Sequence, residues 1–120
     1  MTKVMWGKSI HVDLHGCNNY VKNPKKIEEF VAKLCEEINM KRHGPLHLDY
    51  FGEGNLKGYS CMQFIETSSI TAHFDHQKGK PYRAFIDIFS CKDFDEKKTG
   101  EFCKNYFSAE KINSRTLIRK

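Results

Sequence analysis

The middle of the chain, from Leu46 to Ser90, consists of apolar segments with the two-residue period of β-strands. Glycine-rich or polar turns separate these segments. One turn is Gly52-Glu53-Gly54-Asn55, and a polar loop at 75–81 precedes the last segment. The pattern predicts four neighbouring strands, at residues 46–51, 58–66, 70–74 and 82–90, with a break between the second and the third at 67–69.

Helices and further strands are predicted on both sides of this region. Asn23-Pro24 is a favourable helix start, because the asparagine can cap the first turn and the proline lacks an N–H that would go unpaired there. Apolar residues then recur at three- and four-residue spacing, which predicts an amphipathic helix over 24–40. We expect a second helix over 93–107 and outer strands at 8–14 and 112–118.

The order strand, helix, four strands, helix, strand predicts an α+β fold. We expect a two-layer α/β sandwich, in which two helices cover one face of a largely antiparallel sheet. The other face of the sheet is then open unless a second copy of the chain covers it. Because 120 residues leave room for one hydrophobic core, residues 1–120 are expected to form a single domain.

Composition argues against several classes of protein. With 39% hydrophobic residues the chain is globular rather than disordered. Its net charge of +5 is scattered and forms no long basic run, so no nucleic-acid partner is predicted. It has no apolar stretch of membrane-spanning length and no leader-like segment at 1–6, so no membrane association is expected. Five cysteines without a CxxC pair predict a reduced, cytoplasmic protein.

The break between the two middle strands carries the residues with the clearest chemical meaning. The run there is Ile65-Glu66-Thr67-Ser68-Ser69-Ile70-Thr71-Ala72-His73, and the next strand ends in Asp87-Ile88-Phe89-Ser90-Cys91. A serine at such a junction can attack the carbonyl group before it and form an ester. Elimination then cuts the chain and leaves dehydroalanine, which hydrolyses to a ketone. A ketone at a chain terminus can accept the electron pair left when an amino acid loses carbon dioxide, a task for which enzymes usually bind a cofactor.

These two motifs resemble those of the small prokaryotic S-adenosylmethionine decarboxylases, which depend on a pyruvoyl group. The resemblance covers roughly residues 8–107. It implies cleavage between Thr67 and Ser68, after which Ser68 becomes the pyruvoyl group that forms a Schiff base with the substrate. No metal is implied. The product would be the aminopropyl donor for polyamine (spermidine) synthesis.

The resemblance also assigns roles to other residues. His73 matches the base that promotes self-processing, and Ser60 matches a serine that assists it. Cys91 matches the proton donor to the decarboxylated carbon. Phe51 is the candidate for stacking on a purine, and Glu66 is expected to contact the substrate. The family further implies a homodimer of processed chains, with active sites near the subunit interface.

Three departures from the family pattern leave the substrate open. Thr67 stands where the family usually has glutamate, and Ser69 stands where it usually has histidine. The loop after His73 begins Phe74-Asp75-His76-Gln77 in place of a Trp-Pro-Glu run. One alternative is pyruvoyl chemistry on another amino acid, such as ornithine or arginine. Others are a non-catalytic relative that binds a nucleoside or a partner, and an enzyme that breaks down S-adenosylmethionine without a pyruvoyl group.

Each of these residues also has a purely structural interpretation. Ser68 is a common turn residue, His73 can be an ordinary cleft histidine, and Cys91 can be a small buried apolar residue. Metal binding is disfavoured, because histidines four residues apart on a strand, such as His11 and His15, lie about 13 Å apart at the backbone. The remaining cysteines are expected in or near the core, at positions 17, 35, 61 and 103.

Overall fold

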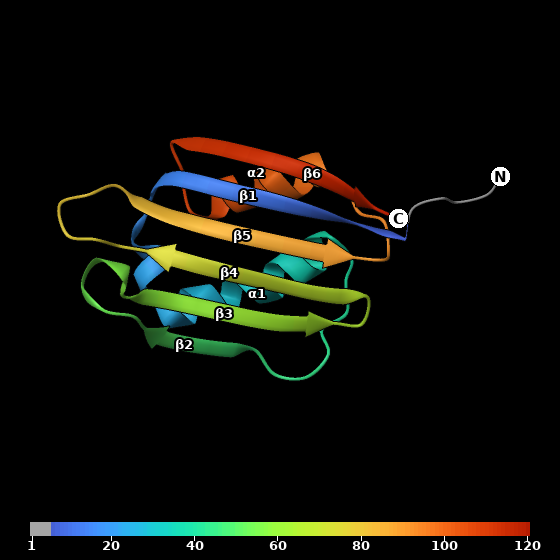
Figure 1. The fold of residues 1–120 in the computed structure, drawn as a ribbon, viewed down its shortest axis with the longest axis horizontal. Coiled ribbons are helices and arrows are strands. Elements are labelled where there is room, and N and C mark those ends of the chain that lie inside the picture. Colours follow the sequence, from blue (N-terminus) through green and yellow to red (C-terminus); the bar gives the residue numbers. More distant parts are fainter. Residues whose placement is uncertain (1–5) are drawn as a thin grey trace.

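A six-stranded antiparallel sheet forms one layer of the molecule and two helices form the other (Figure 1). The computed structural model describes residues 6–120. The helices are α1 (Pro24–Glu37) and α2 (Glu96–Tyr106), with short 3-10 helices η1 (Asn19–Lys22) and η2 (Gly54–Leu56). The strands are β1 (Gly7–Cys17), β2 (His47–Phe51), β3 (Gly58–Ile65), β4 (Ser68–Asp75), β5 (Tyr82–Ser90) and β6 (Lys111–Arg119). The predicted architecture is confirmed.

The strands follow the order β2-β3-β4-β5-β1-β6 across the sheet. β2 to β5 are therefore neighbours in chain order, as the short turns between them require. The first strand of the chain, β1, lies between β5 and β6 and pairs antiparallel with both. This long-range insertion pairs the first strand of the described chain with its last strand, β6, which lies at the edge of the sheet.

Several boundaries differ from the predicted ones. α1 ends at Glu37 rather than at residue 40, because Asn39 adopts a left-handed backbone with a φ of 55°. Asparagine tolerates this conformation better than most residues and ends helices with it. The break between β3 and β4 covers residues 66–67 rather than 67–69, so Ser68 and Ser69 belong to β4.

The core lies between the sheet and the helices. α1 contributes Ile27, Phe30, Val31 and Leu34, all with no exposed surface. The ring of Phe30 packs at 4.7 Å from that of Phe107, which follows α2. Alternate residues of the inner strands complete this layer, at Ile10, Val12, Leu14, Ile70, Ala72, Ala84, Ile86 and Ile88.

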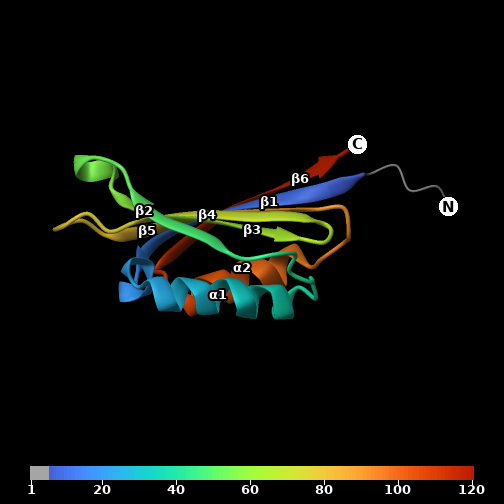
Figure 2. The same cartoon turned by 90° about the horizontal axis from the view of Figure 1, so that it is seen from below.

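The opposite side of the sheet carries no helix, and we call it the open face (Figure 2). Because side chains alternate along a strand, it collects the residues between the core positions. Some are apolar and well exposed, namely Met62 (41%), Phe64 (49%) and Leu117 (53%). Among the described residues, no helix is long and apolar enough to span a membrane.

Candidate functional site

The bond between Thr67 and Ser68 lies in a tight hairpin turn. Ile65 pairs with Ser68, so only Glu66 and Thr67 connect β3 to β4. Ser68 is the first residue of β4 and also pairs with Ser90, the last residue of β5. Among the described residues, non-glycine positive φ values occur at Asn39 and Ser108 and not in this turn. The pairing of β3, β4 and β5 thus fixes this turn, and neither Glu66 nor Thr67 has a left-handed backbone.

Residues at the end of β5 hold Thr67 by its backbone carbonyl group and by its side chain. The amide nitrogen of Cys91 donates to the carbonyl oxygen of Thr67 at 3.0 Å. The Ser90 hydroxyl donates to the Thr67 hydroxyl oxygen at 2.8 Å, and the Thr67 hydroxyl donates to the sulfur of Met40 at 3.3 Å. The carbonyl group that Ser68 would attack is therefore fixed against β5. Ser68, Thr67 and Cys91 form the first group of predicted site residues.

Ser60 and His73 form a second group, which lies elsewhere in the sheet. They face each other across β3 and β4, and the Ser60 hydroxyl lies 2.7 Å from Nδ1 of His73. His73 shares the open face with Ser69 and Thr71, as the strand alternation predicts. The side chain of His73 is exposed, and that of Ser60 is partly exposed.

The two groups are far apart within one chain. Ser68 and His73 are five residues apart on the same strand, which corresponds to about 17 Å. An odd separation also puts them on opposite faces, with Ser68 on the side of buried Ile70 and His73 on the open face. The distance of about 17 Å along β4 keeps His73 from reaching the α-hydrogen of Ser68 in the same chain.

The two expected substrate contacts are divided in the same way. Phe51 ends β2 opposite Gly58, at the Ser60–His73 end of the sheet, and its side chain is exposed. Glu66 lies in the turn before Ser68, where its carboxylate is 3.8 Å from Nζ of Lys41. Each end of the sheet thus carries part of the predicted site.

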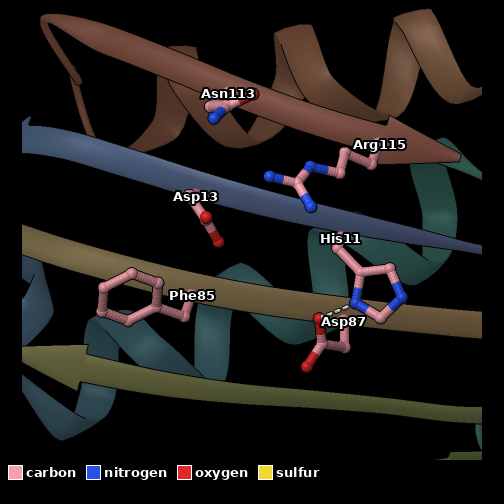
Figure 3. A pocket seen from close by; sticks show the side chains of 6 residues that line it. All are labelled: His11, Asp13, Phe85, Asp87, Asn113 and Arg115. Atoms are coloured by element: carbon pink, nitrogen blue, oxygen red, sulfur yellow. Dashed lines mark hydrogen bonds and ion pairs between the residues drawn. The ribbon is translucent and has the colours of Figure 1, made fainter.

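A hollow of about 410 Å³ on the open face, over β5, β1 and β6, was not among the sequence predictions. Figure 3 shows that polar side chains from β1, β5 and β6 converge there, with His11 Nδ1 2.6 Å from the carboxylate of Asp87. Phe85 forms an apolar wall beside them. Alternation along β1 places His11 and Asp13 on the face opposite to buried Val12, but it does not show which strands join them there. The lining residues are His11, Asp13, Phe85, Asp87, Asn113 and Arg115.

A second hollow of about 520 Å³ continues from the first towards the Ser68 end of the sheet. Both are lined by His11 and Asp87. The second also reaches Ser69, the neighbour of Ser68, and includes Phe89 and Arg119. The guanidinium group of Arg119 lies over the Phe89 ring at 5.3 Å from its centre. The open face is therefore hollowed along a path that ends beside the predicted cleavage site.

Of the cysteines other than Cys91, Cys35, Cys61 and Cys103 are buried and Cys17 is partly buried. Burial raises the pKa of the Cys103 thiol to about 12 and that of the Cys61 thiol to about 12. Burial also raises the pKa of Cys17, to about 11. A raised pKa keeps a thiol protonated and unreactive at neutral pH. Within residues 6–120, no group of three or more His, Cys, Asp or Glu side chains is arranged to hold a metal ion.

Comparison with known proteins identifies the family. The family model for S-adenosylmethionine decarboxylase matches residues 8–120, nearly the whole chain. The chain belongs to the S-adenosylmethionine decarboxylase family. This membership supports a decarboxylase-like role, and the prediction made from the two motifs is confirmed at the level of the family.

A solved structure agrees with the fold of this family. The crystal structure of the adenosylmethionine decarboxylase from Aquifex aeolicus VF5 superposes with a TM-score of 0.77. The match covers 96% of this chain and 91% of that chain, at 17% sequence identity. At this identity the likeness concerns the fold. A search of curated proteins found no match.

Proposed function

We propose that the chain is a self-processing, pyruvoyl-dependent decarboxylase whose substrate is S-adenosylmethionine. The observation that carries this proposal is the hydrogen bond from the Cys91 amide to the Thr67 carbonyl oxygen, at 3.0 Å. It joins the two motifs shared with the family at the one carbonyl group that processing must attack. Ser68 follows that carbonyl group directly, at the start of β4.

Processing would proceed by rearrangement of one peptide bond. The Ser68 hydroxyl attacks the Thr67 carbonyl carbon; the C–N bond breaks and the nitrogen takes the hydroxyl proton, which leaves an ester. A base then removes the α-hydrogen of Ser68, and the bond between its Cβ and the ester oxygen breaks. Thr67 keeps a free carboxylate, and the new terminus is dehydroalanine. Addition of water and loss of ammonia convert this terminus to the pyruvoyl ketone.

Charge on the Thr67 carbonyl oxygen is the main obstacle to the first step. The oxygen becomes negative while Ser68 adds to the carbon, and the Cys91 amide already points at it. A backbone N–H fixed in this way stabilises such a charge without further reorganisation. The turn between β3 and β4 thus supports the acyl shift at Thr67 and not at a neighbouring peptide.

Decarboxylation would then use groups at the same end of the sheet. The pyruvoyl ketone supplies the sink for the electron pair released with carbon dioxide. Cys91 follows β5 directly and remains partly exposed, so its thiol is available to return a proton to the product carbon. Glu66, adjacent to Thr67, is available to contact the substrate from the turn.

The base must come from a second chain, because His73 lies about 17 Å along β4 from Ser68. A second copy laid on the open face brings the groups together if its two-fold axis runs perpendicular to the strands. Such an axis reverses the strand direction, so the partner copy presents its Ser60–His73 end above Ser68 and Cys91. The same operation brings the partner copy's Phe51 towards this end. We therefore propose a homodimer with two composite sites.

The open face is suited to such a partner. Met62, Phe64 and Leu117 are exposed there in the single chain, and burying them would stabilise a dimer. A two-fold pair uses the same surface on both copies. The hollows lined by His11 and Asp87 would then be enclosed between the two sheets.

Intact mass spectrometry of the purified chain tests the proposal. We expect fragments of 67 and 53 residues, with the mass of a pyruvoyl group at the start of the shorter one, and no cleavage of Ser68→Ala. A wild-type chain that stays intact and unmodified after long incubation would overturn it.

Release of carbon dioxide from a panel of S-adenosylmethionine, ornithine and arginine tests the substrate. Thr67 carries no carboxylate, and this departure is the reason to include the two smaller amino acids. Preference for either of them would keep the pyruvoyl chemistry and replace the substrate. Binding of S-adenosylmethionine by an intact chain without turnover would indicate a non-catalytic relative.

A further inference from the structure

Ser90 is a buried polar residue at the point where three segments meet. It ends β5, has no exposed surface, and pairs with Ser68 on one side and with Lys8 on the other. A buried hydroxyl is costly unless it forms hydrogen bonds. The contacts of this hydroxyl therefore show what the position is used for.

The Ser90 hydroxyl is the centre of a directed chain of hydrogen bonds. It accepts from the backbone N–H of Lys92 at 3.0 Å and donates to the Thr67 hydroxyl oxygen at 2.8 Å, which is closer than its other possible acceptor, the sulfur of Met40 at 3.7 Å. The Thr67 hydroxyl in turn donates to the sulfur of Met40 at 3.3 Å. Donor and acceptor capacity match at each step, so the Thr67 side chain is held inward, against the interior.

We propose that Ser90 is a positioning residue for self-processing, an inference that rests on the proposed function. Its bond to the Thr67 side chain and the Cys91 bond to the Thr67 carbonyl oxygen are made from adjacent residues of one strand end. Together they fix residue 67 at two points and prevent rotation of its carbonyl group. The carbon that Ser68 attacks is then held in one orientation, which lowers the entropic cost of the acyl shift.

This arrangement also accounts for threonine at position 67. A hydroxyl on a β-branched side chain can both accept from Ser90 and donate to Met40, and its rotamer is restricted. A carboxylate in the same inward orientation would be placed beside a thioether in the interior, at a large desolvation cost. Thr67 thus acts through the backbone geometry of the turn.

Four single variants of the full chain test this inference. Each is made in a short pulse of cell-free translation, and cleavage is followed by intact mass. Ser90→Ala and Thr67→Val remove the two hydroxyls, and we expect each to slow cleavage about tenfold, the change in rate that corresponds to one net hydrogen bond. Ser90→Thr keeps a hydroxyl at this position and should cleave at close to the wild-type rate.

Thr99→Val is the matched control. Thr99 also has a buried hydroxyl, which donates to the Asp95 carbonyl oxygen at 2.7 Å, but it lies on α2, away from the proposed site, so its removal should leave the cleavage rate unchanged. Thermal unfolding is compared in the uncleavable Ser68→Ala chain, with and without Ser90→Ala. A positioning role predicts slower cleavage with little change in unfolding temperature.

The outcomes separate this inference from the function on which it rests. Equal cleavage of wild type and Ser90→Ala would overturn the role of Ser90 and leave self-processing intact. Slower cleavage that Ser90→Thr fails to rescue, or that accompanies a large loss of stability, would also overturn it. A wild-type chain that is not cleaved would overturn the proposed function, and the role of Ser90 with it.

Discussion

The Ser60 hydroxyl lies 2.7 Å from Nδ1 of His73, and this pair stands at the opposite end of β4 from Ser68. The relationship follows from the register of β3 and β4, which sets Ser60 across from His73 and Ile65 across from Ser68. The residues of one predicted site are thereby divided between two ends of a single sheet. Several predictions about the assembled protein depend on this division.

Complementation between two inactive variants tests whether the sites are shared. Ser68→Ala and His73→Asn chains should each remain uncleaved when expressed alone. When they are co-expressed, a mixed dimer contains one site with an intact Ser68 from one copy and an intact His73 from the other. The His73→Asn chain should then be cleaved, which intact mass detects by its altered mass. Absence of cleavage in demonstrated mixed dimers would show that both residues act within one chain.

Charged substitutions on the open face should dissociate the dimer. Phe64→Glu and Leu117→Glu each place a carboxylate where the second copy is expected to bury an apolar side chain. We expect dissociation at micromolar concentration, measured by analytical ultracentrifugation, together with loss of cleavage. Asn105→Glu is the control, because Asn105 is exposed on α2, which covers the other face of the sheet. Dimers that persist with both face substitutions would contradict this interface.

Lys8 should contribute stability that disappears at high pH. Its ammonium is buried, which lowers its pKa, but hydrogen bonds and charges from Asp93 and Glu96 outweigh this effect and raise the pKa above the ordinary 10.5. A raised pKa in the folded state means that the stabilisation is complete below 10.5 and is lost as the pH rises through the folded value.

Urea unfolding of Lys8→Met measures this contribution. At pH 7 we expect a loss of about 1 kcal/mol, because both acidic partners are partly exposed and screened by water. The difference from wild type should shrink as the pH rises above 10.5. Lys97→Met, on the exposed surface of α2, is the control and should change stability little at any pH. A difference that is constant with pH would show that packing, not charge, is lost.

Gly58→Ala should disturb the Ser60–His73 pair from within the sheet. A Cβ at Gly58 would collide with the backbone carbonyl oxygen of Phe74, which cannot move without shifting β4. We expect a loss of roughly 1–3 kcal/mol, as for other overpacked sites, and slower cleavage. Gly100→Ala is the control: its Cβ would lie 3.3 Å from the flexible end of Ile112, and alanine favours the helix. Unfolding temperature and cleavage rate check both variants.

Much of the fold could be predicted because its signals are local. Alternation marked the strands, and the capping residue Asn23 with Pro24 marked the start of α1. The end of α1 could not be predicted in the same way. Ile38 continues the apolar spacing of the helix, yet α1 ends at Glu37, because Asn39 has a left-handed backbone.

The division of the site could not be predicted, because it depends on the strand register and on the face of the sheet on which each side chain lies. Five residues between Ser68 and His73 suggest that the two side chains are close. In a strand, however, five residues span about 17 Å, and an odd separation puts the two side chains on opposite faces of the sheet. The hollow at His11 and Asp87 had no sequence signal for a related reason. It requires β1 to lie between β5 and β6, a pairing between residues that are far apart along the chain.

The position of β1 would also determine what happens to the domain if the 67–68 bond is cut as we propose. The upstream piece supplies β1, β2 and β3 and the downstream piece supplies β4, β5 and β6, yet their order in the sheet is interleaved. β1 is hydrogen-bonded between two downstream strands, β5 and β6, and β3 is paired with β4. Cleavage would therefore leave both fragments in the same sheet, and the two fragments would separate only when the domain unfolds.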